Sequence, residues 1–472
     1  MGRRAGVTVP SSPAPCPPPC APSTGRSRWP ACGSPPACRT CRSSVRRAFA
    51  RASPGPLSPG PSCRIWSCDL QYQSPNKLAG ASAVPKRRTV SHHRVAKTLA
   101  LALLLLLVVG SAAAQAVKFD ADERERVATL GPWPPPAKVD PSNRVSGQPA
   151  AIALGERLFS TASLSGVGGL RCASCHEQWR GFVDGRTTGL GAEPGARNTL
   201  PLRNVALQRW FGWDGANDSL WAQSVRPMLD PREMKSSPAR VAAVMRGDAD
   251  LSAGYAKAFG APQPSDDEAL LVDVGKALAA YQETLVSART PFDAFRDALA
   301  KGDARDAAPY PAAAQRGLRV FVGKGQCIAC HAGPNFSDGA FHRSSIASRG
   351  PEGEPDTGRQ HGLQSLLASR FNLLGRYSDD ATRATAAHTR QAAADASAVV
   401  GLFRTPSLRE VAATGPYMHD GSVENLCDAL RPHAEGGVEL SRSDRVDVVA
   451  FLRTLGVEAR PPYVDERVFL CR

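Results

Sequence analysis

The chain has 472 residues and an apolar fraction of 42%, enough for two or three ordinary globular domains. Its formal charge of +15 lies in the N-terminal part, because residues 1–116 hold 16 of the 58 Lys and Arg residues and a single acid, Asp69. The remaining chain carries 42 basic and 42 acidic residues, which argues against an extended nucleic-acid-binding surface there.

A secretory signal lies inside this basic part. Basic residues precede an apolar run from Leu99 to Val109, and the small residues after it offer a cleavage site at Ala114 or Ala116. The run is shorter than the roughly 20 residues that span a bilayer. We therefore expect residues 90–116 to be a cleaved signal peptide, with an uncleaved anchor as the alternative. The mature protein is then periplasmic and has no membrane span.

The segment before this signal has the composition of a chain that does not fold. Residues 1–85 are rich in Pro, Arg and Ser and contain seven of the 13 cysteines without the spacing of a metal site. We predict that residues 1–89 are disordered or not translated, with translation starting near Val90. A plant-type transit peptide, which is also basic and poor in acids, is the competing interpretation.

The exported part begins with a Pro-rich stretch, residues 117–147, that predicts an extended arm. Two similar parts follow, residues 148–305 and 306–472. In each, a short amphipathic helix (Ala151–Phe159 and Ala312–Val322) precedes a cysteine motif and a Gly- and Asp-rich loop. Strand-like alternation is scarce, so we expect a mainly α fold with long loops.

Both parts contain the motif Cys-x-x-Cys-His, formed by Cys172, Cys175 and His176 and by Cys327, Cys330 and His331. Composition alone predicts about 0.007 copies of this spacing in such a chain. The motif attaches haem c: the thiols bond the porphyrin, and the adjacent imidazole ligates the iron. A zinc site or a redox-active cysteine pair does not explain a histidine in the fifth place twice. The sequence therefore predicts two cytochrome c-like domains with two covalently bound haem c groups.

Further motifs between and after these sites resemble the bacterial dihaem cytochrome c peroxidase and MauG superfamily. The resemblance covers Leu154 to Leu455. It is carried by Arg197-Asn198, Phe211–Gly215, Ser219–Gln223, Pro231–Met234, Asp356–Arg359, Phe403–Arg409 and Gly415–Gly421. It implies that the first domain reacts with hydrogen peroxide and that the second transfers electrons.

The resemblance also assigns roles to individual residues. Glu233 matches the distal acid/base that moves a proton when the O–O bond breaks, Gln223 a distal amide that binds peroxide, and Pro227 a nearby proline. Trp213 matches the tryptophan that relays electrons between the haems. Without the resemblance, Glu233 reads as a solvated residue at a helix start and Gln223 as a structural amide.

A calcium site between the domains is implied in the same way. Asn198, Thr414 and Pro416 match its ligands, one side-chain oxygen and two main-chain carbonyls. Taken alone, these three are ordinary turn residues.

The sequence departs from the peroxidase branch at two haem ligands. The loop Gly185–Pro201 lacks the histidine that closes the first haem there, so we predict an open, five-coordinate first haem. His433 occupies the place of the second haem's sixth ligand, which is Met in peroxidases and Tyr in MauG; an exposed histidine is the alternative. We expect His419 to lie near the second haem and His342, His361 and His388 to be solvated. Cys427 and Cys471 form either a disulfide or two free thiols.

Together these features predict a periplasmic dihaem oxidoreductase that reduces hydrogen peroxide, nearer to MauG than to the peroxidases. Its electrons come from a small periplasmic protein, a c-type cytochrome or cupredoxin, or from a protein substrate. A non-catalytic dihaem electron-transfer cytochrome is the alternative, but an electron carrier gains nothing from an open site with a distal acid.

Overall fold

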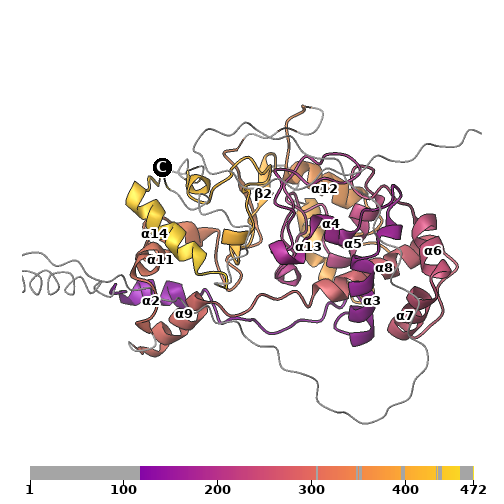
Figure 1. Ribbon diagram of the computed structural model, residues 1–472, viewed down its shortest axis with the longest axis horizontal. Helices are drawn as coiled ribbons and strands as arrows, with labels where there is room; N and C mark the ends of the chain where they lie inside the picture. The colour runs from indigo at the N-terminus through magenta and orange to yellow at the C-terminus, as the bar shows by residue number, and fades with distance from the viewer. Residues whose placement is uncertain are drawn as a thin grey trace, which may run out of the picture. The chain divides into compact units, whose positions relative to one another are not determined.

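The computed structural model describes residues 117–303, 307–346, 349, 353–394, 399–431, 433, 438–457 and 471. The expectations for residues 1–116, an untranslated or disordered segment and a signal peptide, lie outside these residues. Across the described ranges the fold is mainly α-helical with long loops (Figure 1), which confirms the predicted class. No helix among the described residues is long and apolar enough to cross a membrane.

The helices of the first cluster pack around α8. They are α3 (Pro149–Phe159), α5 (Leu220–Leu229), α6 (Pro238–Gly247), α7 (Ala249–Phe259) and α8 (Asp267–Gln282), with the short helices η1 (Ala162–Leu164), α4 (Cys172–Cys175), η2 (Gln178–Arg180) and η3 (Val205–Leu207) between them. Residues on every side of α8 are buried, as in a central core helix. Gly155 permits the close approach of α3, since a Cβ there would lie 2.0 Å from the Ala277 carbonyl oxygen.

The second cluster is built on α11 (Ala312–Val322) and α14 (Arg442–Arg453), which lie side by side (Figure 1). Gly317 allows this contact because a Cβ would meet the Asp447 carbonyl oxygen at 1.9 Å. Aromatic rings of Phe321, Phe336 and Phe451 fill the interior between the helices. The short helices η4 (Cys327–Ala329), η7 (Val411–Ala413) and η8 (Asp428–Leu430) surround this core.

Two helices depart from the predicted organisation. Residues 117–147 were expected to be extended, but Ala121–Ala128 form α2, because Asp120 and Glu123 make a capping box and the prolines begin only at Pro132. Both α2 and α9 (Pro291–Lys301) pack in the second cluster. α9 belongs to residues 148–305, which the sequence predicts to form the first domain, but its Phe292 and Phe295 are buried in the second cluster.

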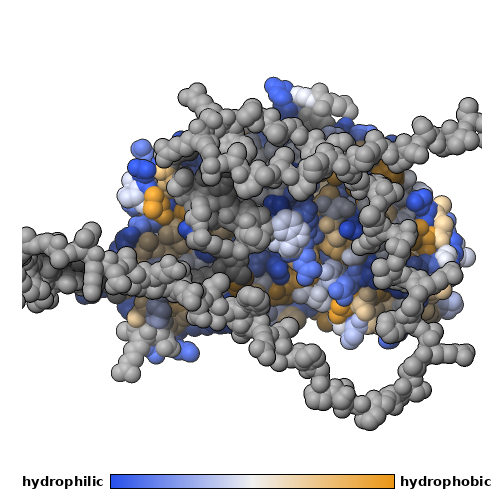
Figure 2. Space-filling model, in the orientation of Figure 1, coloured by the Kyte–Doolittle hydropathy of each residue, from blue (hydrophilic) through white to orange (hydrophobic). Residues whose placement is uncertain are grey.

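The segment between the second cysteine motif and α14 contributes to both clusters. It contains β1 (Phe341–Arg343), α12 (Arg359–Ala368), η5 (Ala384–Ala386), α13 (Ala387–Ala394) and β2 (Leu402–Arg404). β1 and β2 are antiparallel, with His342 opposite Phe403. Phe371 and Leu373 pack in the first cluster, and the Lys276 ammonium of α8 lies 2.6 Å from the Asp379 carboxylate. On the face that Figure 2 shows, hydrophilic and hydrophobic residues are interspersed where grey atoms do not cover the surface.

Candidate active site

The two Cys-x-x-Cys-His motifs have the same local geometry. His176 Nδ1 lies 2.9 Å from the carbonyl oxygen of Phe182, and His331 Nδ1 lies 3.0 Å from that of Phe336. Because a carbonyl oxygen only accepts, Nδ1 carries the proton in both rings. Each histidine therefore keeps the Nε2 lone pair for a metal, the arrangement that protein partners impose on metal-binding histidines.

No motif in the sequence marks the two phenylalanines that accept these hydrogen bonds. Phe182 and Phe336 adopt left-handed backbone conformations, with φ of 64° and 51°, and both side chains are buried. Their turns direct the carbonyls back toward the histidines. The sequence signal is an apolar residue five or six positions after each motif histidine, and it is weak without the contact.

The cysteine and histidine side chains of the motifs are uncharged in their surroundings. Burial raises the pKa of Cys172 to about 12 and the pKa values of Cys175 and Cys327 to about 11, so these three thiols are protonated at neutral pH. Burial and the neighbouring His433 lower the pKa of His331 to about 4. A neutral imidazole is the form that ligates iron.

Three of the predicted residues come together beside the first motif. Gln223 and Pro227 lie one turn apart on α5, and the Pro227 carbonyl accepts a hydrogen bond from Met234 N at 3.0 Å. This bond holds the turn that carries Glu233. Ala192 N binds the Glu233 carbonyl, and the Leu190 carbonyl of the same loop lies 3.8 Å from the Cys175 sulfur, so the Glu233 turn lies near the first motif.

Two neighbours of these residues were not predicted. The Glu233 carboxylate forms an ion pair of 2.6 Å with Arg226, and the Gln223 side-chain oxygen accepts a hydrogen bond of 2.9 Å from Asn217. Arg226 lies between Gln223 and Pro227 in the sequence, so helical periodicity could have placed it on the same face.

The loop that lacks a histidine packs against the Glu233 turn. Ala192 N donates to the Glu233 carbonyl at 2.8 Å, and Glu193 N donates to the Arg232 carbonyl at 2.9 Å. Gly191 is required at this contact, because a Cβ would lie 2.4 Å from the Arg232 oxygen. The Leu190 carbonyl lies 3.8 Å from the Cys175 sulfur, so the loop also borders the first motif.

Trp213 lies where residues of the two motif-bearing parts meet. Its Nε1 donates to the Asn198 carbonyl at 2.8 Å, and its own carbonyl accepts from Arg404 N at 2.8 Å. The indole meets the His419 ring edge-on at a centroid distance of 6.4 Å, and His419 stacks on Phe403. Trp213 thus contacts Asn198, which follows the first motif in the sequence, and Arg404 and His419, which follow the second.

Charged residues hold the Trp213 segment in place. Arg197 pairs with Asp214 at 2.6 Å and, through two bonds, with Asp356. Arg359 Nη1 donates to the Gly215 carbonyl at 2.7 Å, and His361 Nδ1 lies 3.2 Å from the Asp214 carboxylate. The sequence motifs that contain these residues do not by themselves predict these contacts.

The histidines of the 342–388 segment differ in exposure. His342 and His361 are largely exposed, as expected, with side-chain exposures of 45% and 64%. His388 was also expected to be solvated, but its ring packs edge-on against Trp210 at 4.7 Å, because α13 lies over this tryptophan. That expectation for His388 was wrong.

The three residues matched to calcium ligands lie on two neighbouring loops. Asn198 N donates to the His419 carbonyl at 2.9 Å, which joins its loop to the segment containing Thr414 and Pro416. The Asn198 side-chain nitrogen donates to the Arg186 carbonyl at 2.9 Å, so its side-chain oxygen is the atom that suits a hard cation.

His433 lies opposite His331. Their ring centroids are 6.3 Å apart, and two imidazoles that share one iron at about 2 Å from each nitrogen stand about 6 Å apart. His433 Nδ1 lies 2.9 Å from the Ala429 carbonyl, so its Nε2 also keeps its lone pair. His176, His331 and His433 therefore share one arrangement, in which Nδ1 binds a backbone carbonyl.

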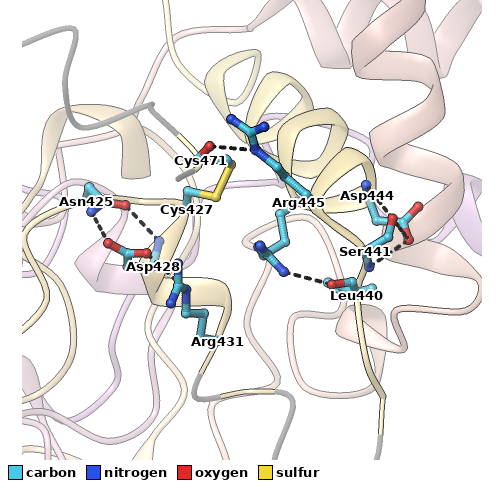
Figure 3. Close-up of a disulfide and its surroundings, with 10 residues drawn as sticks. Asn425, Cys427, Asp428, Arg431, Leu440, Ser441, Asp444, Arg445 and Cys471 are labelled. Atoms are coloured by element: carbon cyan, nitrogen blue, oxygen red, sulfur yellow. Dashed lines mark hydrogen bonds and ion pairs between the residues drawn. A yellow bond between two sulfur atoms is a disulfide. The ribbon is translucent and has the colours of Figure 1, made fainter.

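Cys427 and Cys471 form a disulfide (Figure 3). Cys427 immediately precedes η8, whose Ala429 carbonyl accepts from His433. Arg442 Nε of α14 donates to the Cys471 carbonyl at 3.0 Å. Of the two alternatives left open by the sequence, the structure has the disulfide.

Known proteins are similar in sequence and in fold. A family model described as di-haem cytochrome c peroxidase matches residues 149–301. The methylamine utilization protein MauG of Methylorubrum extorquens is 33% identical over 354 residues, 72% of this chain and 87% of that protein. Cytochrome c551 peroxidase of Pseudomonas aeruginosa is 30% identical over 318 residues, 66% of this chain and 80% of that protein.

A solved structure agrees with these relatives. The crystal structure of a MauG-like protein associated with microbial copper homeostasis superimposes with a TM-score of 0.52 at 25% identity, over 72% of this chain and 99% of that one. The chain therefore belongs to the di-haem cytochrome c peroxidase and MauG family and is a di-haem oxidoreductase.

Proposed function

We propose that the protein is a periplasmic enzyme with two covalently attached haem c groups, held by Cys172, Cys175 and His176 and by Cys327, Cys330 and His331, that reduces hydrogen peroxide to water at the first haem. The observation that carries this proposal is the position of Glu233, whose turn is hydrogen-bonded to the loop that borders Cys175 of the first motif. The loop from Gly185 to Pro201 contains no histidine that could close that site. When bound, the haem supplies an iron for the peroxide oxygen and a store of electrons.

The protein's own groups handle the protons. Reduction of one peroxide consumes two electrons and two protons and yields two waters. Glu233 accepts the proton of the inner oxygen and returns it to the outer oxygen as the O–O bond breaks. Gln223 orients the peroxide with its amide, whose oxygen Asn217 already holds. Pro227 keeps this face of α5 close to the Glu233 turn through the hydrogen bond of its carbonyl.

The second haem stores and passes electrons in this proposal. His331 and His433 would hold its iron, and Trp213 would carry electrons between the two haem sites. Calcium bound by Asn198, Thr414 and Pro416 holds together the two loops that flank Trp213. The contacts of Trp213 with Asn198 and Arg404 support this arrangement.

The electrons come from a small periplasmic redox protein, a c-type cytochrome or cupredoxin, or from a protein substrate. A relative named cytochrome c551 peroxidase supports a cytochrome as the electron source. A non-catalytic electron-transfer cytochrome is the second candidate. It is less well supported, because it has no use for an acid beside an open haem.

Rapid mixing of the holoprotein with hydrogen peroxide tests the proposal. We expect fast spectral changes in the wild type and a rate lower by about 10²–10⁴-fold in Glu233→Gln, since general acid–base catalysis contributes that much. Glu193→Gln is the control, because this exposed glutamate lies in the loop that contacts the same turn. A wild-type protein that does not react with peroxide is a carrier instead.

A further inference from the structure

Arg226 occupies the same face of α5 as two residues of the candidate site. It lies three residues after Gln223 and directly before Pro227, at a spacing that places them on one side of the helix. The other side buries Trp221, Val225 and Met228 in the first cluster. The Arg226 side chain is 41% exposed, so it borders the open side of the helix.

The guanidinium of Arg226 is held by two carboxylates. Nη1 lies 3.0 Å from Asp230 Oδ2, and Nη2 lies 2.6 Å from Glu233 Oε1. Exposed pairs of this kind add little to the stability of a fold. The contact therefore matters more for where it holds Glu233 than for the free energy of folding.

Arg226 remains a cation in this setting. The nearby charge of Glu233 raises the pKa of the guanidinium, and that of Asp230 adds to the effect, against the lowering effect of burial. A guanidinium has five N–H donors in a rigid plane. Two ion pairs leave donors for a further acceptor on the same side of α5.

We propose that Arg226 is a positioning residue of the first haem site, which fixes the Glu233 carboxylate and presents N–H donors to an anionic ligand there. This inference rests on the proposed function, because it needs an open first haem on the side of Glu233. A fixed cation stabilises the negative charge that develops on the outer oxygen as peroxide is cleaved. It also favours binding of a simple anion over that of a neutral ligand.

Binding of two small ligands to the holoprotein tests the inference without turnover. Fluoride is titrated into the ferric protein and carbon monoxide into the reduced protein, and first-haem spectra report both. We expect Arg226→Gln to weaken fluoride binding by about tenfold or more, because the anion loses a hydrogen bond from a charged donor. Carbon monoxide, which is neutral, should change by less than about twofold, since no charged contact is lost.

Two further variants make the result specific. Arg226→Lys keeps the positive charge but lacks the planar set of N–H donors of the guanidinium. Its fluoride affinity should lie between those of Arg226→Gln and the wild type. Arg157→Gln is the matched control: this α3 arginine is 46% exposed and also pairs with two carboxylates, those of Asp248 and Asp250. It should leave fluoride binding unchanged.

The outcomes separate this inference from the function on which it rests. A wild-type protein in which fluoride does not bind the first haem contradicts the open site itself. Normal binding in the wild type and an equal affinity in Arg226→Gln contradict only the role of Arg226. If Arg226→Gln weakens the binding of fluoride and of carbon monoxide equally, the site has collapsed, and this result also overturns the proposal.

Discussion

Arg409 and Asp293 form an ion pair in which both side chains are fully buried. Arg409 Nη2 lies 2.9 Å from Asp293 Oδ1, and Nη1 lies 3.1 Å from Oδ2. Arg409 Nε also donates to the carbonyl of Pro334, three residues after His331, and the guanidinium stacks 3.5 Å from the Trp133 ring centroid. The pair thus connects α9 with the segment that follows the second motif.

Removing one partner of this pair should be costly. Asp293→Asn leaves a buried arginine without its counter-charge, and we expect the free energy of unfolding to fall by about 3–5 kcal/mol. Denaturant unfolding followed by the absorbance of the second haem measures it. Asp250→Asn, which removes an exposed carboxylate paired with the exposed Arg157, should cost less than about 1 kcal/mol. Equal effects of the two variants would contradict this account.

The same carboxylate makes stability depend on pH. Burial raises the pKa of Asp293, but hydrogen bonds and charge from Arg409 outweigh it and hold the pKa below 3.8. Because the folded pKa is lower than the unfolded one, the contribution is complete above the unfolded pKa and is lost as pH falls through the folded one. The difference in unfolding free energy between wild type and Asp293→Asn should therefore shrink below pH 4. A difference that stays constant down to pH 3 would refute the assignment.

Most of the features that the sequence predicts come from the spacing of residues a few positions apart. The motif spacing predicts the residues that attach haem, and the spacing along α5 brings Gln223 and Pro227 together. The capping box of Asp120 and Glu123 could also have predicted the start of α2, but the prolines after it favoured an extended arm. Contacts such as Arg197 with Asp356, 159 residues apart, leave no trace in one sequence. They form only when the loops of the two parts meet.

Replacing Trp213 should slow electron transfer without unfolding the protein. Trp213→Phe keeps an aromatic ring but loses the indole donor to the Asn198 carbonyl, a loss of about 1 kcal/mol. After one equivalent of peroxide, oxidation of the second haem should be slower. Trp221→Phe is the control, because it loses a similar bond, from Nε1 to Ser142 Oγ, inside the first cluster. Similar slowing in both variants would remove the special role of Trp213.

Two substitutions of His433 should change different properties of the second haem, its spin state and its reduction potential. His433→Ala removes the ring opposite His331, so we expect a high-spin, five-coordinate ferric signal by electron paramagnetic resonance. His433→Met should stay low-spin with a higher reduction potential, because a thioether ligand raises it. His342→Ala, which removes an exposed histidine paired with Asp338, is the control. An unchanged low-spin signal in His433→Ala would exclude this ligand.

Opening the disulfide should weaken both the fold and the position of His433. The bond joins residues 44 apart, and closing a loop of that length stabilises a protein by about 4 kcal/mol. The double variant Cys427→Ser with Cys471→Ser avoids a stray thiol and should show this loss in denaturant unfolding. Since a folded domain has only about 5–15 kcal/mol in total, such a loss is large.

The effect should reach the second haem through the short helix η8. Cys427 precedes η8, and the Ala429 carbonyl within it orients the His433 ring (Figure 3 shows the disulfide). Without the disulfide this turn loses its covalent link to the residue that Arg442 of α14 holds. Cyanide should then displace His433 from the second haem more readily than in the wild type. If cyanide binding is unchanged although stability falls, the disulfide supports the core but does not hold the ligand.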